Sequence, residues 1–149
     1  MLTVLITLFT AQAGNLHKKY EWETVPNIEV CPETNISIQE IRNAADYWVE
    51  TTNFRYNKIT KVSSCKKGKE NTIQITDGRG VNKDKEHAKT TVHSWFYENN
   101  EDRCFIDYVV VKIPHELKYS SQKDVVLLHE FGHAAGYGHS NHEIMKSIH

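Results

Sequence analysis

Two stretches of the chain carry apolar residues at the spacing of a helix. The first begins after Ser37, which with Glu40 makes a capping box, and Asn53 provides a stop. Its apolar positions are Ile38, Ile41, Ala44, Ala45, Trp48 and Val49. The three- and four-residue steps between them predict a helix with one face toward a core.

The second stretch, "SQKDVVLLHEFGHAA", is apolar almost all round. "SQKD" resembles a capping box near Ser121, and Gly136 is expected to stop the helix because glycine readily adopts the left-handed conformation. Such a helix must be mostly buried, and a buried helix should not carry His129, Glu130 and His133 without partners. These polar residues therefore need an explanation.

Four shorter segments have the residue types of β-strands. They are "PNIEVCP", "NTIQITDG", "TTVHSWFY" (Thr90–Tyr97) and "CFIDYVVVKIP" (Cys104–Pro114), with a turn at "ENNEDR" between the last two. The apolar run Tyr108–Val111 suggests a strand covered on both faces, whereas Thr90–Tyr97 is more polar and suggests an edge strand. Between the second and third segments, "DGRGVNKDKEHAK" indicates a long surface loop.

Composition limits the class of protein. The chain has 149 residues, 39% hydrophobic and 25% charged, which fits one globular domain with a real core. A formal net charge of −1 gives no field that would attract nucleic acid, so nucleic-acid binding is disfavoured. After the N-terminus, no apolar run approaches the ~20 residues of a membrane span, so no membrane partner is expected.

The N-terminus, "MLTVLITLFTAQAG", resembles a secretory signal peptide. An apolar run precedes Ala11 and Ala13, which make the A-x-A arrangement that signal peptidases accept, although no basic residue comes before it. We therefore expect a signal peptide at residues 1–13, a secreted protein, and a single domain at residues 14–149. The alternative is a buried N-terminal strand.

Three cysteines, Cys31, Cys65 and Cys104, cannot all pair within one chain. In an oxidising compartment, the simplest outcome is one disulfide and one free or intermolecular thiol. Their number alone does not indicate which two pair.

The segment "HEFGHAAGYGHS" has the spacing of a metal site. His129 and His133 lie four positions apart, so on a helix both imidazoles project from one face and can bind one ion. A catalytic Zn²⁺ takes three protein ligands and keeps one position for water. Gly136 allows the chain to turn back and offer His139 as the third ligand, while Glu130 is free to take a proton from the metal-activated water.

A second histidine follows the turn closely. His142 lies three residues after His139, and the spacing after Gly136 favours His139 as the ligand. His142 is then an outer-shell residue, a bystander or a substitute ligand.

"HEFGHAAGYGH" resembles the zinc-binding signature of the metzincin metalloendopeptidases, most closely the matrixin-like members. The resemblance implies that His129, His133 and His139 are zinc ligands and that Glu130 is the general base. It also implies a tight turn beneath the metal with a methionine, for which Met145 in "HEIMKSIH" is the candidate. The function implied is that of a zinc-dependent endopeptidase acting on a peptide or protein substrate.

The resemblance also implies a fold. That fold is α+β and zincin/metzincin-like: a twisted mixed sheet of about four to five strands with an antiparallel edge strand, packed on two long helices, with a short C-terminal part. Thr90–Tyr97 would be the edge strand, which holds an extended peptide by backbone hydrogen bonds. Aligned in this way, Cys65 and Cys104 fall at the same end of neighbouring strands, so a Cys65–Cys104 disulfide and an unpaired Cys31 are expected.

One departure from the family supports an alternative function. Met145 comes only six residues after His139, and little chain follows it to build the usual C-terminal wall of the specificity pocket. The alternative is a catalytically weak or inactive, zinc-stabilised protein that binds a peptide or a partner on the Thr90–Tyr97 edge without cutting it.

Overall fold

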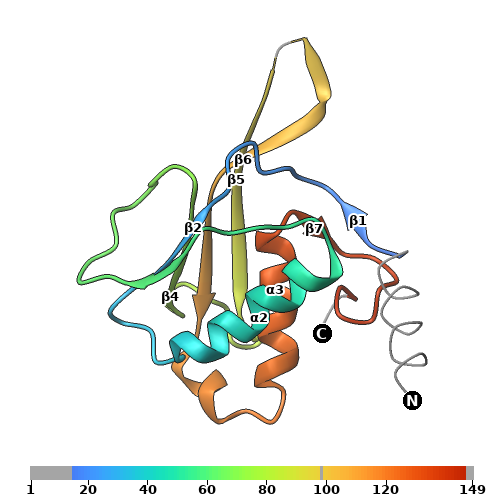
Figure 1. Cartoon of the computed structure of the whole chain (residues 1–149). Coiled ribbons are helices and arrows are strands. Elements are labelled where there is room, and N and C mark those ends of the chain that lie inside the picture. Colours follow the sequence, from blue (N-terminus) through green and yellow to red (C-terminus); the bar gives the residue numbers. More distant parts are fainter. Residues whose placement is uncertain (1–14, 98, 147–149) are drawn as a thin grey trace.

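A five-stranded sheet with two helices on one face forms the body of the protein (Figure 1). The structure is a computed structural model that describes residues 15–97 and 99–146. The expected signal peptide at residues 1–13 lies outside the described residues. None of the helices in the described part has the length and apolar character needed to cross a membrane.

The elements follow one another in an α+β order. They are β1 (His17–Lys18), β2 (Asn27–Val30), α2 (Ile38–Thr51), β3 (Ile59–Lys61), β4 (Thr72–Asp77), β5 (Lys89–Tyr97), β6 (Asn100–Ile113), a 3₁₀ helix (His115–Tyr119), α3 (Lys123–Ala134) and β7 (Tyr137–Gly138). The main sheet has the order β3-β2-β4-β6-β5, in which only β5 is antiparallel to its neighbour. The α+β class, the mixed sheet and the antiparallel edge strand are therefore confirmed.

Helix α2 begins as predicted. The Ser37 side chain accepts a hydrogen bond from the Glu40 backbone N–H at 3.1 Å, and the Glu40 carboxylate accepts one from the Ser37 backbone N–H at 2.9 Å. The helix ends at Thr51, two residues before the expected stop. Its buried residues lie on one face and pack into the core: Ile41, Ala44, Ala45 and Trp48.

Helix α3 begins later than predicted. Its N-cap is Gln122, which makes no side-chain capping bond, so the box expected at Ser121 is wrong. The Ser120 hydroxyl instead accepts a hydrogen bond from the Gln122 backbone N–H at 3.1 Å, at the exit from the 3₁₀ helix. Val125 in the first turn is 49% exposed, whereas the helix is mostly buried from Val126 to Ala134.

Strand β6 is covered less completely than its apolar run suggests. Val109 and Val111 are fully buried against the helices, but Tyr108 and Val110 on the other face are half-buried. His93 of β5 stacks on Tyr108 with ring centroids 4.1 Å apart. In the described part of the chain, both long helices lie on the first face, and side chains such as His93 and Tyr108 cover part of the other (Figure 1).

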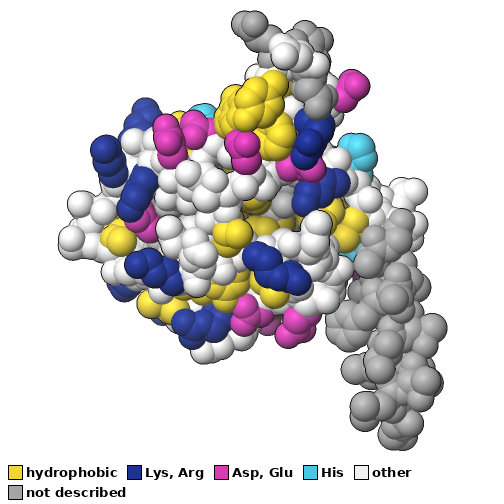
Figure 2. All heavy atoms as spheres, turned by 45° about the horizontal axis from the view of Figure 1, so that its top comes forward, with side chains coloured by type: hydrophobic (Ala, Val, Ile, Leu, Met, Phe, Trp, Pro, Cys, Tyr) yellow, Lys and Arg dark blue, Asp and Glu magenta, His cyan; other side chains and the backbone are white. Residues whose placement is uncertain are grey.

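On the face drawn in Figure 2, cationic and anionic side chains are interspersed. Apolar side chains gather beside the hairpin of β5 and β6. In the sequence of this hairpin, Phe96 is 54% and Tyr97 is 50% exposed. No large area of one charge sign covers this face.

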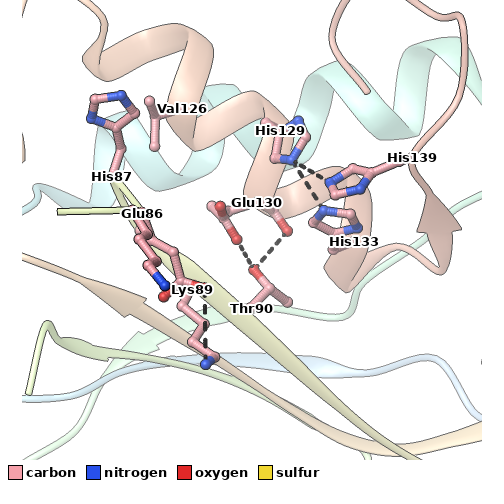
Figure 3. A pocket seen from close by; sticks show the side chains of 11 residues that line it. Glu86, His87, Lys89, Thr90, Val126, His129, Glu130, His133 and His139 are labelled. Atoms are coloured by element: carbon pink, nitrogen blue, oxygen red, sulfur yellow. Dashed lines mark hydrogen bonds and ion pairs between the residues drawn. The ribbon is translucent and has the colours of Figure 1, made fainter. Parts of the chain in front are cut away.

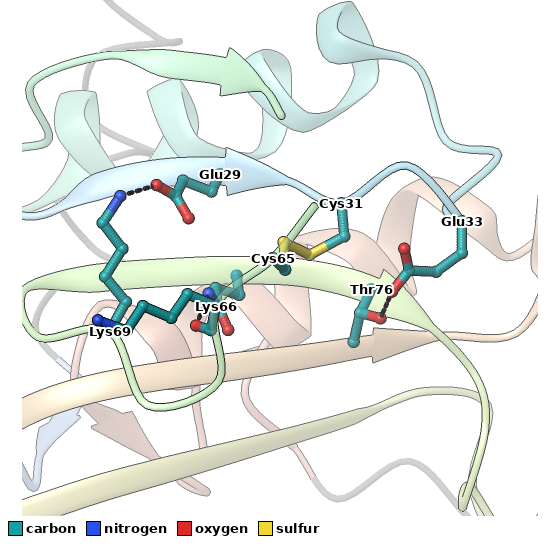
Figure 4. The surroundings of a disulfide bond; sticks show 8 residues. Glu29, Cys31, Glu33, Cys65, Lys66, Lys69 and Thr76 are labelled. Carbon is teal, nitrogen blue, oxygen red and sulfur yellow. Dashed lines mark hydrogen bonds and ion pairs between the residues drawn. A yellow bond between two sulfur atoms is a disulfide. The ribbon is translucent and has the colours of Figure 1, made fainter. Parts of the chain in front are cut away.

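The disulfide joins Cys31 to Cys65, not Cys65 to Cys104, so the expected pairing is wrong (Figure 4). Strands β2 and β3 are parallel neighbours, and the Val62 backbone N–H just after β3 donates to the Val30 carbonyl at 3.0 Å. Cys31 and Cys65 therefore follow the same ends of adjacent strands, with their Cα atoms 5.5 Å apart. Disulfides persist in oxidising compartments, which is the environment this bond indicates.

Cys104 is a free, partly buried thiol at the opposite end of the sheet. Thr72, the first residue of β4, pairs with Tyr108, so Cys104 lies beyond the start of the parallel strands. The loop 62–71 crosses the length of the sheet to reach β4, and Cys65 lies at its beginning rather than at its end. Cys65 was expected at the start of β4 because it is close to β4 in the sequence, but it lies at the other end of the sheet.

We expect alkylation of the unreduced protein to label Cys104 alone, and alkylation after reduction to label all three cysteines. Because the bond closes a loop of 34 residues, the double variant Cys31→Ser/Cys65→Ser should lose about 4 kcal/mol of unfolding free energy in urea titrations. Cys104→Ser is the matched control and should change it by no more than about 0.5 kcal/mol. Labelling of Cys31 before reduction would contradict the assignment.

Candidate metal centre

Three histidine nitrogens converge at the C-terminal end of α3 (Figure 3). His129 Nε2 lies 3.1 Å from His133 Nε2 and 3.3 Å from His139 Nε2, and one ligand nitrogen from each ring lies within 4.8 Å of the others. Two nitrogens bound to one zinc ion at about 2.0–2.1 Å in a tetrahedral shell are about 3.3 Å apart. The donor set therefore fits a metal ion, and the three histidines could hold one.

The far side of two rings is fixed by the backbone. His129 Nδ1 lies 2.7 Å from the Ile144 carbonyl, and His133 Nδ1 lies 2.9 Å from the Tyr137 carbonyl. Since a carbonyl oxygen only accepts hydrogen bonds, each Nδ1 carries the proton and each Nε2 has a free lone pair. Outer-shell bonds of this kind orient metal-binding histidines.

Burial keeps these imidazoles neutral. Burial lowers the pKa of His129. It is also the main reason why the pKa of His133 is lowered to about 4, and the neighbouring His129 lowers this pKa further. The neutral imidazole is the form that binds a metal ion, because a protonated ring has no free lone pair.

The turn that brings His139 to the site depends on Gly136. Its φ is +107°, and a Cβ at this position would lie 2.2 Å from the Tyr20 carbonyl oxygen. Gly136 thus ends the helix, as predicted, and also admits a neighbouring backbone that was not predicted. Strand β7 then runs toward His139, which is exposed at the rim of the site.

The structure brings His139, and not His142, into the cluster of possible ligands. His142 is 3% exposed, and its ring centroid lies 6.1 Å from that of Trp48. Its Nδ1 accepts a hydrogen bond from the Ile144 backbone N–H at 3.2 Å. His142 therefore supports the segment whose Ile144 carbonyl holds His129.

Met145 lies beneath the helical part of the site. It is fully buried in a tight turn, where its backbone N–H donates to the His142 carbonyl at 2.9 Å. A Cβ on Gly132, between the two helical histidines, would lie 2.3 Å from Met145 Sδ and 2.6 Å from a ring carbon of Trp48. Gly132 is thus required by packing, a role that the sequence did not reveal.

Glu130 is a buried carboxylate beside the histidines, only 7% exposed. The Thr90 hydroxyl at the start of β5 donates a hydrogen bond to this carboxylate. Burial raises the pKa of Glu130 to about 7, against the smaller opposing effect of Thr90. Thr90 was predicted only as part of an edge strand, and its contact with Glu130 depends on how the sheet packs on α3.

A pocket of about 320 Å³ opens over Glu130 and the three histidines. Its remaining lining residues come from the end of the long polar loop, the start of β5 and α3: Lys85, Glu86, His87, Ala88, Lys89, Thr90 and Val126. The loop, predicted only as a surface segment, therefore forms one wall of the site.

Comparisons of the chain with family models, curated proteins and solved structures found no match. The assignment of a function therefore depends on the geometry and chemistry of this chain's own residues.

Proposed function

We propose that the protein is a secreted zinc-dependent endopeptidase with a metzincin-like fold. One observation carries the proposal: three Nε2 atoms converge within metal-binding distance beside a buried carboxylate, and the group opens into a pocket. A structural zinc site is normally closed by four protein ligands, whereas three histidines leave a position open.

Zinc bound by His129, His133 and His139 would supply a Lewis acid for a peptide carbonyl and make a water molecule more acidic. Glu130 takes a proton from that water as its oxygen attacks the carbonyl carbon. As the carbon–nitrogen bond breaks, the Glu130 carboxyl gives the proton to the leaving amine. The Thr90 hydroxyl fixes the orientation of the carboxylate during both transfers.

The substrate in this proposal is an extended polypeptide. Strand β5 is an edge strand of the sheet, and its first two residues, Lys89 and Thr90, line the pocket. The backbone groups of an edge strand can pair with an added strand, which holds a peptide without dependence on its side chains. A peptide added along β5 would pass beside Glu130.

The test is incubation of the zinc-loaded protein with an unfolded protein, with and without a chelator. We expect fragments that the chelator suppresses and that added zinc restores. Zinc binding and retention of the unfolded protein without fragments would instead support the alternative of a zinc-stabilised binding protein. Fragments that persist in the chelator would show that the cleavage does not depend on a metal.

A further inference from the structure

Residues 17–22, here called the N-terminal strap, lie along the turn that carries the third histidine (Figure 1). Strand β1 in the strap pairs antiparallel with β7, with His17 opposite Gly138 and Lys18 opposite Tyr137. The Lys18 ammonium also lies 5.2 Å from the centre of the Tyr137 ring. These two strands form a sheet of their own, so within the described residues β1 is the strand that pairs with β7.

The strap also binds two carbonyls at the end of α3, one in the last residue of the helix and one just beyond it. The backbone N–H groups of Lys19 and Tyr20 donate to the Gly136 carbonyl at 2.8 and 2.9 Å. The Trp22 indole Nε1–H donates to the Ala134 carbonyl at 2.8 Å. The final carbonyls of a helix have no partners within the helix, so the Trp22 bond satisfies one of them at Ala134. The bonds to Gly136 hold the turn by which the chain leaves α3.

The other end of the strap is bound to the main sheet. The Glu21 backbone N–H donates to the Cys104 carbonyl at 2.9 Å, and the Ile106 N–H donates to the Glu21 carbonyl at 2.7 Å. Arg103 forms an ion pair with the Glu21 carboxylate at 2.8 Å. The strap therefore connects strand β6 to the turn before His139.

The two kinds of ligand are positioned differently. His129 and His133 are held by a helix that packs into the core, whereas His139 is exposed and follows the short strand β7. From these contacts we propose that the N-terminal strap is a positioning element of the metal centre, which sets the third histidine for metal binding. The inference rests on the three-histidine site of the proposed function and assigns a role to residues outside it.

The test is the zinc affinity of Trp22→Phe, measured by competition with a chelator of known affinity. The substitution removes the indole N–H but keeps an aromatic ring, and we expect the zinc dissociation constant to rise about tenfold, as for other outer-shell bonds. The matched control is Trp95→Phe, in the β5–β6 hairpin, where Trp95 packs on the Phe105 ring. Its zinc affinity should stay within about twofold of the wild type.

A second variant and a spectrum separate positioning from a general loss of stability. Lys18→Ala removes the cation above Tyr137 without changing a core residue, and should weaken zinc binding about threefold. The visible absorption of cobalt(II) in the site reports coordination geometry, and should change in Trp22→Phe but not in Trp95→Phe.

Unchanged zinc affinity and an unchanged cobalt spectrum in Trp22→Phe would overturn the inference. If Trp22→Phe does not fold, Lys18→Ala decides in the same way. A wild-type protein that binds no zinc would instead overturn the metal site itself, and with it the proposed function. Normal zinc binding in the wild type and in both strap variants would refute only the role of the strap.

Discussion

Replacing Glu130 by glutamine is expected to lower the rate of peptide hydrolysis by about 1,000-fold or more while leaving zinc in the site. Glutamine has nearly the same shape and can still accept the hydrogen bond from the Thr90 hydroxyl, but it cannot take a proton from water. Because the carboxylate is not among the three ligands, the metal content should not change. The measurements are turnover of an unfolded protein substrate and zinc per chain.

The matched control is Glu29→Gln. Glu29 and Glu130 are both 7% exposed, but Glu29 lies on β2, where it pairs with Lys69 away from the pocket. The control therefore tests whether neutralising a buried carboxylate outside the pocket affects turnover. We expect Glu29→Gln to hydrolyse the substrate at the wild-type rate. Turnover retained in Glu130→Gln would contradict the role of Glu130.

The second large effect is a loss of zinc affinity, expected when His139, the third ligand, is replaced. His139→Ala should weaken zinc binding by more than about 100-fold, beyond the usual effect of an outer-shell change, because it removes one of three nitrogen donors. His139 is exposed, so the substitution should have little effect on the unfolding free energy of the metal-free chain. Competition with a chelator measures the affinity, and urea titration measures the stability.

His142→Ala is the control for this loss. The residue is another histidine in the same segment, but its ring packs toward Trp48 and its Nδ1 binds the Ile144 backbone. The variant should be less stable than the wild type, yet still bind zinc. If His142→Ala lost the metal and His139→Ala kept it, the assignment of the third ligand would be reversed.

The candidate site could be predicted well from sequence because its parts lie close together in the chain. The i, i+4 spacing of His129 and His133 fixes their relation on any helix, and Gly136 limits how the chain can continue. The partners of these residues could not be predicted in the same way. Thr90 and Trp22 reach the site through the packing of the sheet and the strap, which no local pattern encodes.

The fold was predictable where periodicity is long and strong. The capping box at Ser37 and the apolar spacing after it gave α2, and β-branched runs gave four strands of the main sheet. Strand β3 was not predicted because it has only three residues, none of them buried. Strands β1 and β7 were not predicted either, because they have two residues each. Such short strands exist only because a neighbour pairs with them.

The cysteine pairing failed for a related reason. Sequence order places Cys65 before β4, and the direction of the intervening loop cannot be read from its polar composition. The pairing depends instead on β3, the strand that was not predicted, because β3 brings the chain beside β2 and next to Cys31. One missing strand was therefore enough to pair the wrong cysteines.

The most direct test of the metal centre is the X-ray absorption fine structure of the zinc-loaded protein, together with its zinc content. We expect one zinc per chain, with three imidazole nitrogens and one oxygen at about 2.0–2.1 Å and no sulfur at about 2.3 Å. A spectrum with a thiolate ligand, or a chain that retains no zinc at neutral pH, would contradict a centre formed by His129, His133 and His139.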